Sequence, residues 1–178
     1  MKSKNVVLAI PLALFALCGS VSANENYFGG GLSFIDYSEN GIGSDASLTT
    51  ITARIGSKFN ENFSGEFRAG FGIGDDTVSV FDTDVNLDLN NYYGVYLLAG
   101  IPVSENFYPY AALGYSRGEV EASAMGFSAS ESESDVSFGF GADIKVSDKF
   151  DINIEYMNYL DKNGAELSGF SLGFTMPF

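Results

Sequence analysis

The residues best suited to chemistry in this sequence are charged side chains that a short reverse turn would bring together. If the chain folds back symmetrically about the middle of FNENF, Arg54 lies opposite Arg68, and Glu66 lies two residues away on the same face. Two guanidinium groups sharing one carboxylate would repel each other, so another strand has to supply acid. Glu155 and Asp88 are the candidates.

A second reverse turn, VSDKF, would place another pair of opposite charges face to face. Lys145 lies opposite Asp151 if the turn is symmetric, and Asp143 follows the same alternation. Together with the first cluster, these residues could line either a gated polar path or a closed plug of ion pairs. The charges expected to share this inner face are Arg54, Glu66, Arg68, Asp143, Lys145, Asp151 and Glu155.

The overall composition excludes several classes of site. The chain has no His, a single Cys at position 18, and a formal net charge of −14. A Ser-His-Asp triad, a Cys-His pair and a His-ligated metal are therefore impossible, and the negative charge argues against nucleic acid. We predict no catalytic, cofactor or metal residues, although a surface enzyme using only carboxylates remains an alternative.

The first 23 residues have the features of a cleavable secretory signal. Lys2 and Lys4 are followed by an apolar run and by small residues, with Val21-Ser22-Ala23 as the cleavage site. A lipoprotein signal using Cys18 is the alternative, but Leu17 stands where a small residue should precede the cysteine. We therefore expect a signal peptide over 1–23 and one exported domain over 24–178, without disulfides.

Apolar residues in the rest of the chain recur at every second position, which predicts an all-β fold. Three tight turns, FNENF, VSENF and VSDKF, alternate with four longer connections near 38–45, 77–83, 120–133 and 161–165. Short turns at one end and long loops at the other indicate an antiparallel up-and-down sheet. The eight expected strands lie near 25–37, 46–59, 63–76, 84–103, 107–119, 134–146, 150–160 and 166–178.

Alternation alone does not say which face of the strands points inward. Eight strands can close as a soluble lipocalin-like carrier with apolar residues inside, or as a membrane barrel with apolar residues outside. The polar face here consists mostly of Gly, Ser, Thr, Asn and Tyr. Such residues fit a narrow lumen but make a poor solvated surface, so we predict an eight-stranded transmembrane β-barrel.

Aromatic residues at the tight-turn end support the membrane interpretation. Eight residues further along two of the strands stand Phe71 and Tyr115, about 26 Å away along the strand and about 20 Å in height after tilting. Aromatic residues of a soluble core would not need to gather at one rim. The residues expected to form a periplasmic aromatic rim are Phe59, Phe63, Phe107, Phe150 and Phe178.

With these features, the sequence resembles the small eight-stranded outer-membrane barrels of Gram-negative bacteria, the OmpA transmembrane domain and the OmpX/Ail-type proteins. The resemblance rests on the signal peptide, the short turns, the segments NYYGVYLLAG and YPYAALGYS, and the alternating C-terminal strand ending in Phe178. It implies short periplasmic turns, longer extracellular loops, and recognition of the last strand by the barrel-assembly machinery. Pro177 is a small departure that suits a strand end better than a ladder interior.

Eight strands leave just enough room inside for side chains, which favours a closed plug over a conducting path. Symmetric pairing about the turn VSENF supports this, because Tyr110 lies opposite Gly100 and Tyr96 opposite Gly114. Large rings above glycines would fill the lumen. Gly-rich stretches such as GGGLSF precede no helix, so they are not phosphate loops.

Acidic residues concentrate in two of the long connections and suggest either a divalent-cation or receptor site, or a solvated surface sharing cations with lipopolysaccharide. We predict a non-enzymatic outer-membrane protein that supports envelope integrity, adhesion or host contact, in contact with lipid, lipopolysaccharide and an unknown receptor. A narrow porin-like channel and a soluble periplasmic carrier are the alternatives. The acidic surface residues are Asp75, Asp76, Asp82, Asp84, Glu119, Glu121, Glu131, Glu133 and Asp135.

Overall fold

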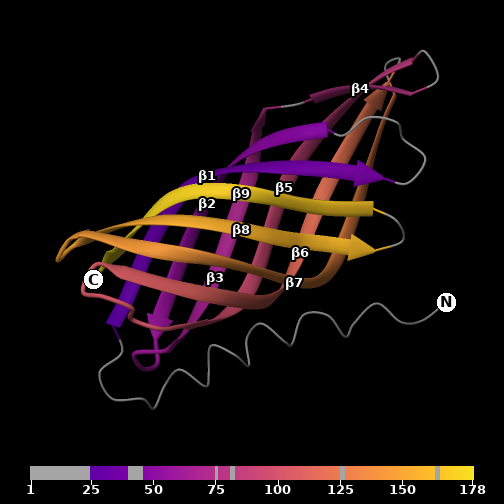
Figure 1. Cartoon of the computed structure of the whole chain (residues 1–178). Helices are drawn as coiled ribbons and strands as arrows, with labels where there is room; N and C mark the ends of the chain where they lie inside the picture. Colours follow the sequence, from indigo (N-terminus) through magenta and orange to yellow (C-terminus); the bar gives the residue numbers. More distant parts are fainter. Residues whose placement is uncertain (1–24, 40–45, 75, 81–82, 125–126, 163–164) are drawn as a thin grey trace.

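The protein forms a closed antiparallel β-barrel, seen in Figure 1 as a tilted cylinder of strands. The computed structural model describes residues 25–39, 46–74, 76–80, 83–124, 127–162 and 165–178. Within that part of the chain, no helix has the length and hydropathy needed to cross a bilayer. The strands are β1 (Glu25–Glu39), β2 (Ala46–Lys58), β3 (Phe63–Gly74), β4 (Asp76–Val80), β5 (Thr83–Gly100), β6 (Phe107–Ala124), β7 (Phe127–Ser147), β8 (Phe150–Lys162) and β9 (Ala165–Pro177).

The wall of the barrel has eight staves, because β3 and β4 both pair with β5 and act as one stave. Each strand pairs with its neighbours in sequence, and β1 closes the cylinder by pairing with β9. The predicted eight-stranded antiparallel barrel is therefore confirmed. In this circular order β3 lies four staves from β8, so the two strands form opposite walls.

The registers expected from symmetric turns are all present. Arg54 pairs with Arg68 across β2 and β3, and Lys145 pairs with Asp151 across β7 and β8. Tyr96 pairs with Gly114 across β5 and β6. A one-residue slip in any of these hairpins would turn every polar side chain of the strand outward, so the alternating pattern holds the register.

The apolar face of the sheet points outward, as predicted for a membrane barrel. Phe138 on β7 is 55% exposed, whereas Arg54 and Glu66 are each only 6% exposed inside the cylinder. Phe67 and Phe174, which would crowd the centre of a soluble barrel, are half-buried on the wall. This orientation rules out the carrier interpretation, which needs the apolar residues inside.

Two of the expected long connections contain strand structure. The region near 120–133 is largely a continuation of β6 and β7, which pair as far as Ala124 and Phe127, and β4 forms in the connection near 77–83. In Figure 1 these strands rise toward the upper right, beyond the ends of β8 and β9. Of the other long connections, residues 40–45 and 163–164 lie outside the described residues.

Candidate functional site

The central feature of the lumen is an ion pair that spans it from wall to wall. Arg68 on β3 donates from Nη1 and Nη2 to the two carboxylate oxygens of Glu155 on β8, at 2.6 and 2.9 Å. Its Nε donates to Glu66 Oε2 at 2.6 Å, and its guanidinium lies 4.4 Å from the ring centroid of Tyr96. With 1% of Arg68 exposed, this bidentate bridge joins opposite sides of the barrel.

Arg54 on β2 neighbours the same carboxylates but is held differently. Its Nη1 lies 3.9 Å from Glu66 Oε2, and its Nη2 lies 4.0 Å from Glu155 Oε1. Both distances are too long for hydrogen bonds, and Arg54 Nε and Nη1 have no hydrogen-bond partner. Two cations thus balance two carboxylates, but only Arg68 is locked in place.

Tyrosine hydroxyls complete the carboxylate coordination from two more strands. Tyr27 on β1 donates to Glu66 Oε1 at 2.9 Å, and Tyr110 on β6 donates to Glu155 Oε2 at 2.8 Å. Asn153 donates from Nδ2 to the Tyr110 oxygen at 2.8 Å and lies 2.7 Å from Asp143 Oδ1. The network therefore includes side chains from six staves, with every carboxylate oxygen of Glu66 and Glu155 bonded.

A layer of hydroxyl groups lies next to the ionic network. Thr52 is 2.5 Å from the Tyr92 hydroxyl and 3.3 Å from Ser33 Oγ. Tyr96 bonds Ser116, and Ser137 donates to the same Ser116 oxygen at 2.6 Å. Most of these bonds join neighbouring strands, while the bond from Tyr92 on β5 to Thr52 on β2 passes over β3, where the Tyr92 ring covers Gly70.

Toward the long-loop end the lumen is filled by an apolar cluster that the sequence analysis did not predict. The cluster combines aliphatic side chains with aromatic rings in contact, and the tilted rings of Tyr92 and Tyr159 have 5.4 Å between their centroids. Most members lie on the inner face by regular alternation, as Ile35 does with Ser33 and Leu48 with Thr50, and a β-bulge near Leu89 turns that side chain inward as well. Its buried members include Ile35, Leu48, Leu89, Tyr92, Met157, Tyr159 and Leu167.

The remaining predicted interior charges lie nearer the short-turn end. Asp143 and Asp151 are partly buried, and Asp143 is joined to the network through Asn153. Lys145 is the exception: its side chain is 43% exposed, and its ammonium pairs with Asp148 Oδ1 at 2.9 Å rather than with Asp151. The prediction that Lys145 is an interior charge is thus wrong. The hydrogen bond from the Lys145 ammonium lowers the pKa of the Asp148 carboxyl.

The ring of one lumen tyrosine lies over a different glycine from the one expected. Tyr96 covers Gly114 as expected, but the ring of Tyr110 lies over Gly141 on β7. Gly100, its expected partner, is covered by Tyr108 instead. The side chain leans along the sheet toward the next strand, which pairing register alone does not indicate.

The five rim aromatics all lie at the short-turn end of the structure. Phe63, Phe107 and Phe178 are exposed, and the Phe59 ring packs over Gly65 on the outer face. Phe150 stacks on Phe174 with 5.8 Å between ring centroids. At the other end Phe71, Tyr115 and Tyr156 are exposed on the wall, so aromatic side chains mark both edges of the apolar belt.

The acidic residues do not converge on one point. Glu119 and Glu121 accept hydrogen bonds from Asn90 and from Ser132 and Ser130, at 3.3–3.4 Å. Asp135 on β7 lies on the other face of the hairpin from Glu119 and Glu121. Its carboxylate accepts a hydrogen bond from the Asp161 amide at 3.4 Å. Among the described residues no group of acids could hold a metal ion. Asp75 and Asp82, and the side chains of Asp76, Asp84 and Glu131, lie outside the described residues.

Comparison with known proteins decides the family. The family model of the outer membrane protein beta-barrel domain matches residues 9–178. The chain belongs to this family. Its place is accordingly the outer membrane, and the outward apolar face described above is its lipid-contacting surface.

Solved structures of other members of the class share the fold at low identity. Ail of Yersinia pestis is 17% identical, with a TM-score of 0.65 over 88% of this chain and 100% of that chain. Neisserial surface protein A is 13% identical, with a TM-score of 0.65 over 88% and 100% of the two chains. OprG of Pseudomonas aeruginosa is 15% identical, with a TM-score of 0.59 over 89% and 98%. A comparison with curated protein sequences finds no match.

Proposed function

We propose that this outer-membrane barrel is a sealed, non-enzymatic anchor that holds a stiff acidic hairpin at the cell surface. The observation that supports this most directly is the Arg68–Glu155 bridge across the lumen, backed by the apolar cluster on its long-loop side. Both layers fill the interior with side chains. Short turns face the periplasm in such barrels, so the extended β6–β7 hairpin points outward from the cell.

The charge of that hairpin indicates what it could contact. Glu119, Glu121, Glu133 and Asp135 stand on its described part, with Arg117 as a nearby cation. A structure of Ail contains the heparin analogue sucrose octasulfate, a polyanion. Glu119 and Glu121 would repel such a ligand. We therefore propose cationic surfaces, or lipopolysaccharide bridged by divalent cations, as contacts in adhesion or envelope stabilisation.

Export and assembly complete the proposal. Residues 1–23 act as a signal peptide removed after Ala23, and the barrel domain is 24–178. The β9 strand, which ends with Pro177 followed by the rim residue Phe178, is the segment that the barrel-assembly machinery would recognise. Support comes from the closing ladder of β9 with β1, in which the Phe178 amide donates to the Asn26 carbonyl at 2.9 Å.

A narrow diffusion channel is the second candidate function. It is favoured by one observation, the absence of hydrogen bonds to Nε and Nη1 of the buried Arg54. An arginine without fixed partners can move and admit water. If the Arg54 side chain moves often enough to admit water, ions would pass beside the network even though Arg68 stays bonded to Glu155.

Conductance in planar bilayers distinguishes the two functions. The purified barrel should pass no steady current if the lumen is sealed. A variant with the bridge and the apolar layer both truncated, Arg68→Ser with Met157→Ala, serves as the control that the measurement detects an open lumen. Steady unitary current from the unmodified barrel would refute the sealed anchor and support the channel.

A further inference from the structure

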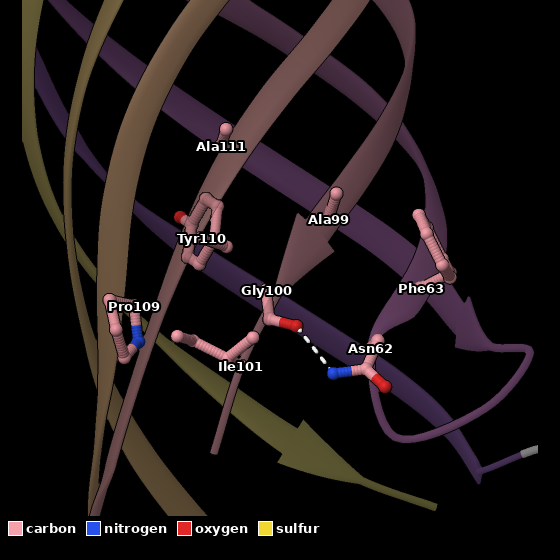
Figure 2. A pocket seen from close by; sticks show the side chains of 8 residues that line it. All are labelled: Asn62, Phe63, Ala99, Gly100, Ile101, Pro109, Tyr110 and Ala111. Carbon is pink, nitrogen blue, oxygen red and sulfur yellow. Dashed lines mark hydrogen bonds between the residues drawn. The ribbon is translucent and has the colours of Figure 1, made fainter. Parts of the chain in front are cut away.

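An apolar hollow interrupts the lipid-facing wall at the short-turn end, where β3, β5 and β6 lie side by side. It has a volume of about 580 Å³ and is open to the outside. Figure 2 shows Phe63 and Pro109 on opposite sides of it, with Ala99 and Ala111 between them. Ala99 and Ala111 are paired across β5 and β6, so two methyl groups form the floor.

The Ala99–Ala111 floor is recessed relative to the wall, because larger side chains flank it along both strands. The pair above is Leu97 and Leu113, both of which stand exposed on the wall. Below it Ile101, the residue that follows β5, is 60% exposed. The hollow is thus a slot in an otherwise bulky surface, with the dimensions for a flexible hydrocarbon chain rather than for a flat contact.

The periplasmic edge of the hollow is polar and rigid. Asn62 donates from Nδ2 to the Gly100 carbonyl at 2.9 Å, which leaves its side-chain oxygen as an acceptor (Figure 2). The turn before it is fixed by Asn60, whose Oδ1 accepts from the amides of Asn62 and Phe63 at 2.9 Å each. The edge is therefore held in place without a ligand.

The turns at this edge carry acidic side chains, and the nearest cations are paired with other acids: Lys58 with Glu25 at 3.3 Å and Lys145 with Asp148 at 2.9 Å. The two turns that meet there, 59–62 and 101–106, carry the exposed carboxylates of Glu61 and Glu105 and contain no Lys or Arg. The third short turn is different, because Asp148 is paired with Lys145 and stands next to Lys149. A cationic group is thus complementary to the hollow's edge and not to the third turn.

We propose that the hollow binds one phospholipid of the periplasmic leaflet whose headgroup ends in a primary ammonium, as in phosphatidylethanolamine. One acyl chain lies on the Ala99–Ala111 floor between Phe63 and Pro109. The ammonium donates to the carboxylates of Glu61 and Glu105. An anionic headgroup at the same place would be repelled by these two carboxylates.

The absence of Trp from the chain gives a clean fluorescence test. Leu113→Trp places a reporter beside the hollow, and Leu32→Trp on β1 places one four staves away on the opposite wall. Each variant is reconstituted in phosphatidylcholine vesicles containing a minor fraction of brominated phosphatidylethanolamine, phosphatidylglycerol or phosphatidylcholine. At position 113 we expect the ethanolamine lipid to bind about two- to fivefold more tightly than the choline or glycerol lipid. This factor corresponds to the free energy of an exposed ion pair.

Two further changes separate the headgroup from the acyl-chain contact. Glu61→Gln with Glu105→Gln should remove the headgroup preference, while Asp161→Asn, which removes an exposed carboxylate at the long-loop end of β8, should leave it unchanged. Ala111→Leu fills the slot and should lower quenching at position 113 by all three lipids. Equal quenching by the three lipids at position 113, or the same preference at position 32, would overturn the proposal. So would a change of oligomeric state with Ala111→Leu, which would make the hollow a contact between copies.

Discussion

At the scale of single residues, the two lumen arginines make a natural comparison, since they face the same carboxylates with different bonding. Arg68→Met removes all the fixed hydrogen bonds to Glu155 from the opposite wall and leaves a buried carboxylate with only Tyr110 as a close donor. We expect a loss of about 3–5 kcal/mol in the free energy of unfolding, measured by urea titration in micelles.

Arg54→Met is the matched control, because it removes the same charge from the same layer but no hydrogen bond from Nε or Nη1. It should cost clearly less than Arg68→Met. The double change Arg68→Met with Glu155→Met should recover part of the loss, because an apolar pair leaves no unpaired charge. Equal losses for the two single arginine variants would contradict the structural distinction between them.

A second residue-scale prediction concerns glycines of β6 that share the inner face. An added Cβ at Gly114 would lie 2.4 Å from the Val95 carbonyl oxygen and from Cδ1 of the Tyr96 ring. At Gly118 the nearest atoms would be 3.9 Å away, an ordinary contact. Gly114→Ala should therefore destabilise the barrel by about 1–3 kcal/mol, and Gly118→Ala should not. Thermal unfolding followed by circular dichroism would measure both, and similar melting temperatures would refute the argument.

At the scale of elements, the strands and their registers followed from two simple regularities, the period-two pattern and the symmetry of the short turns. The pairings of Arg54 with Arg68 and of Tyr96 with Gly114 were predictable for that reason. The apolar cluster was not, because the inner face was expected to be small and polar. Most of its members, such as Ile35 and Leu48, lie on that face by regular alternation, and a bulge turns Leu89 inward as well. Glu155 was one of two candidates, since turn symmetry relates only neighbouring strands.

The extension of β6 and β7 was missed for a different reason. Its sequence is rich in Ser, Ala and Glu, residues that occur in loops and give no apolar alternation to read. What stabilises it is cross-strand pairing, as in the hydrogen bonds from Ser130 to Glu121 and from Ser132 to Glu119. A hairpin of this kind depends on the sheet below it for its register.

The extension gives an element-scale prediction for hydrogen exchange. Amides of β6 between Gly118 and Ser123 pair with β7, so they should exchange far more slowly than free chain, although they stand beyond the apolar belt. Exchange measured by mass spectrometry in detergent micelles tests this. Peptides from the short turn 101–106 provide the exposed reference, and exchange as fast as theirs would show that the region is a loop after all.

At the scale of the whole molecule, stability rests on closure, since a sheet edge in hydrocarbon would leave backbone groups unpaired. The ladder between β1 and β9 runs from Tyr27–Pro177 to Glu39–Ala165 and supplies that closure. Ser171 lies in the middle of β9, where it pairs with both Ser33 on β1 and Glu155 on β8. A change there acts on the cylinder rather than on one side chain.

The closed barrel should remain folded in dodecyl sulfate at room temperature and migrate differently on a gel before and after boiling. Ser171→Pro removes an amide from a strand bonded on both sides, and a proline is not tolerated in such a position. We expect this variant to lose the heat-dependent shift and to run as unfolded chain at both temperatures. Glu61→Pro, in a solvated turn outside the ladder, should retain the shift. Because the shift reports closure of the whole cylinder, its absence in the unmodified protein would count against the barrel itself, whereas its persistence in Ser171→Pro would count only against the importance of the β1–β9 seam.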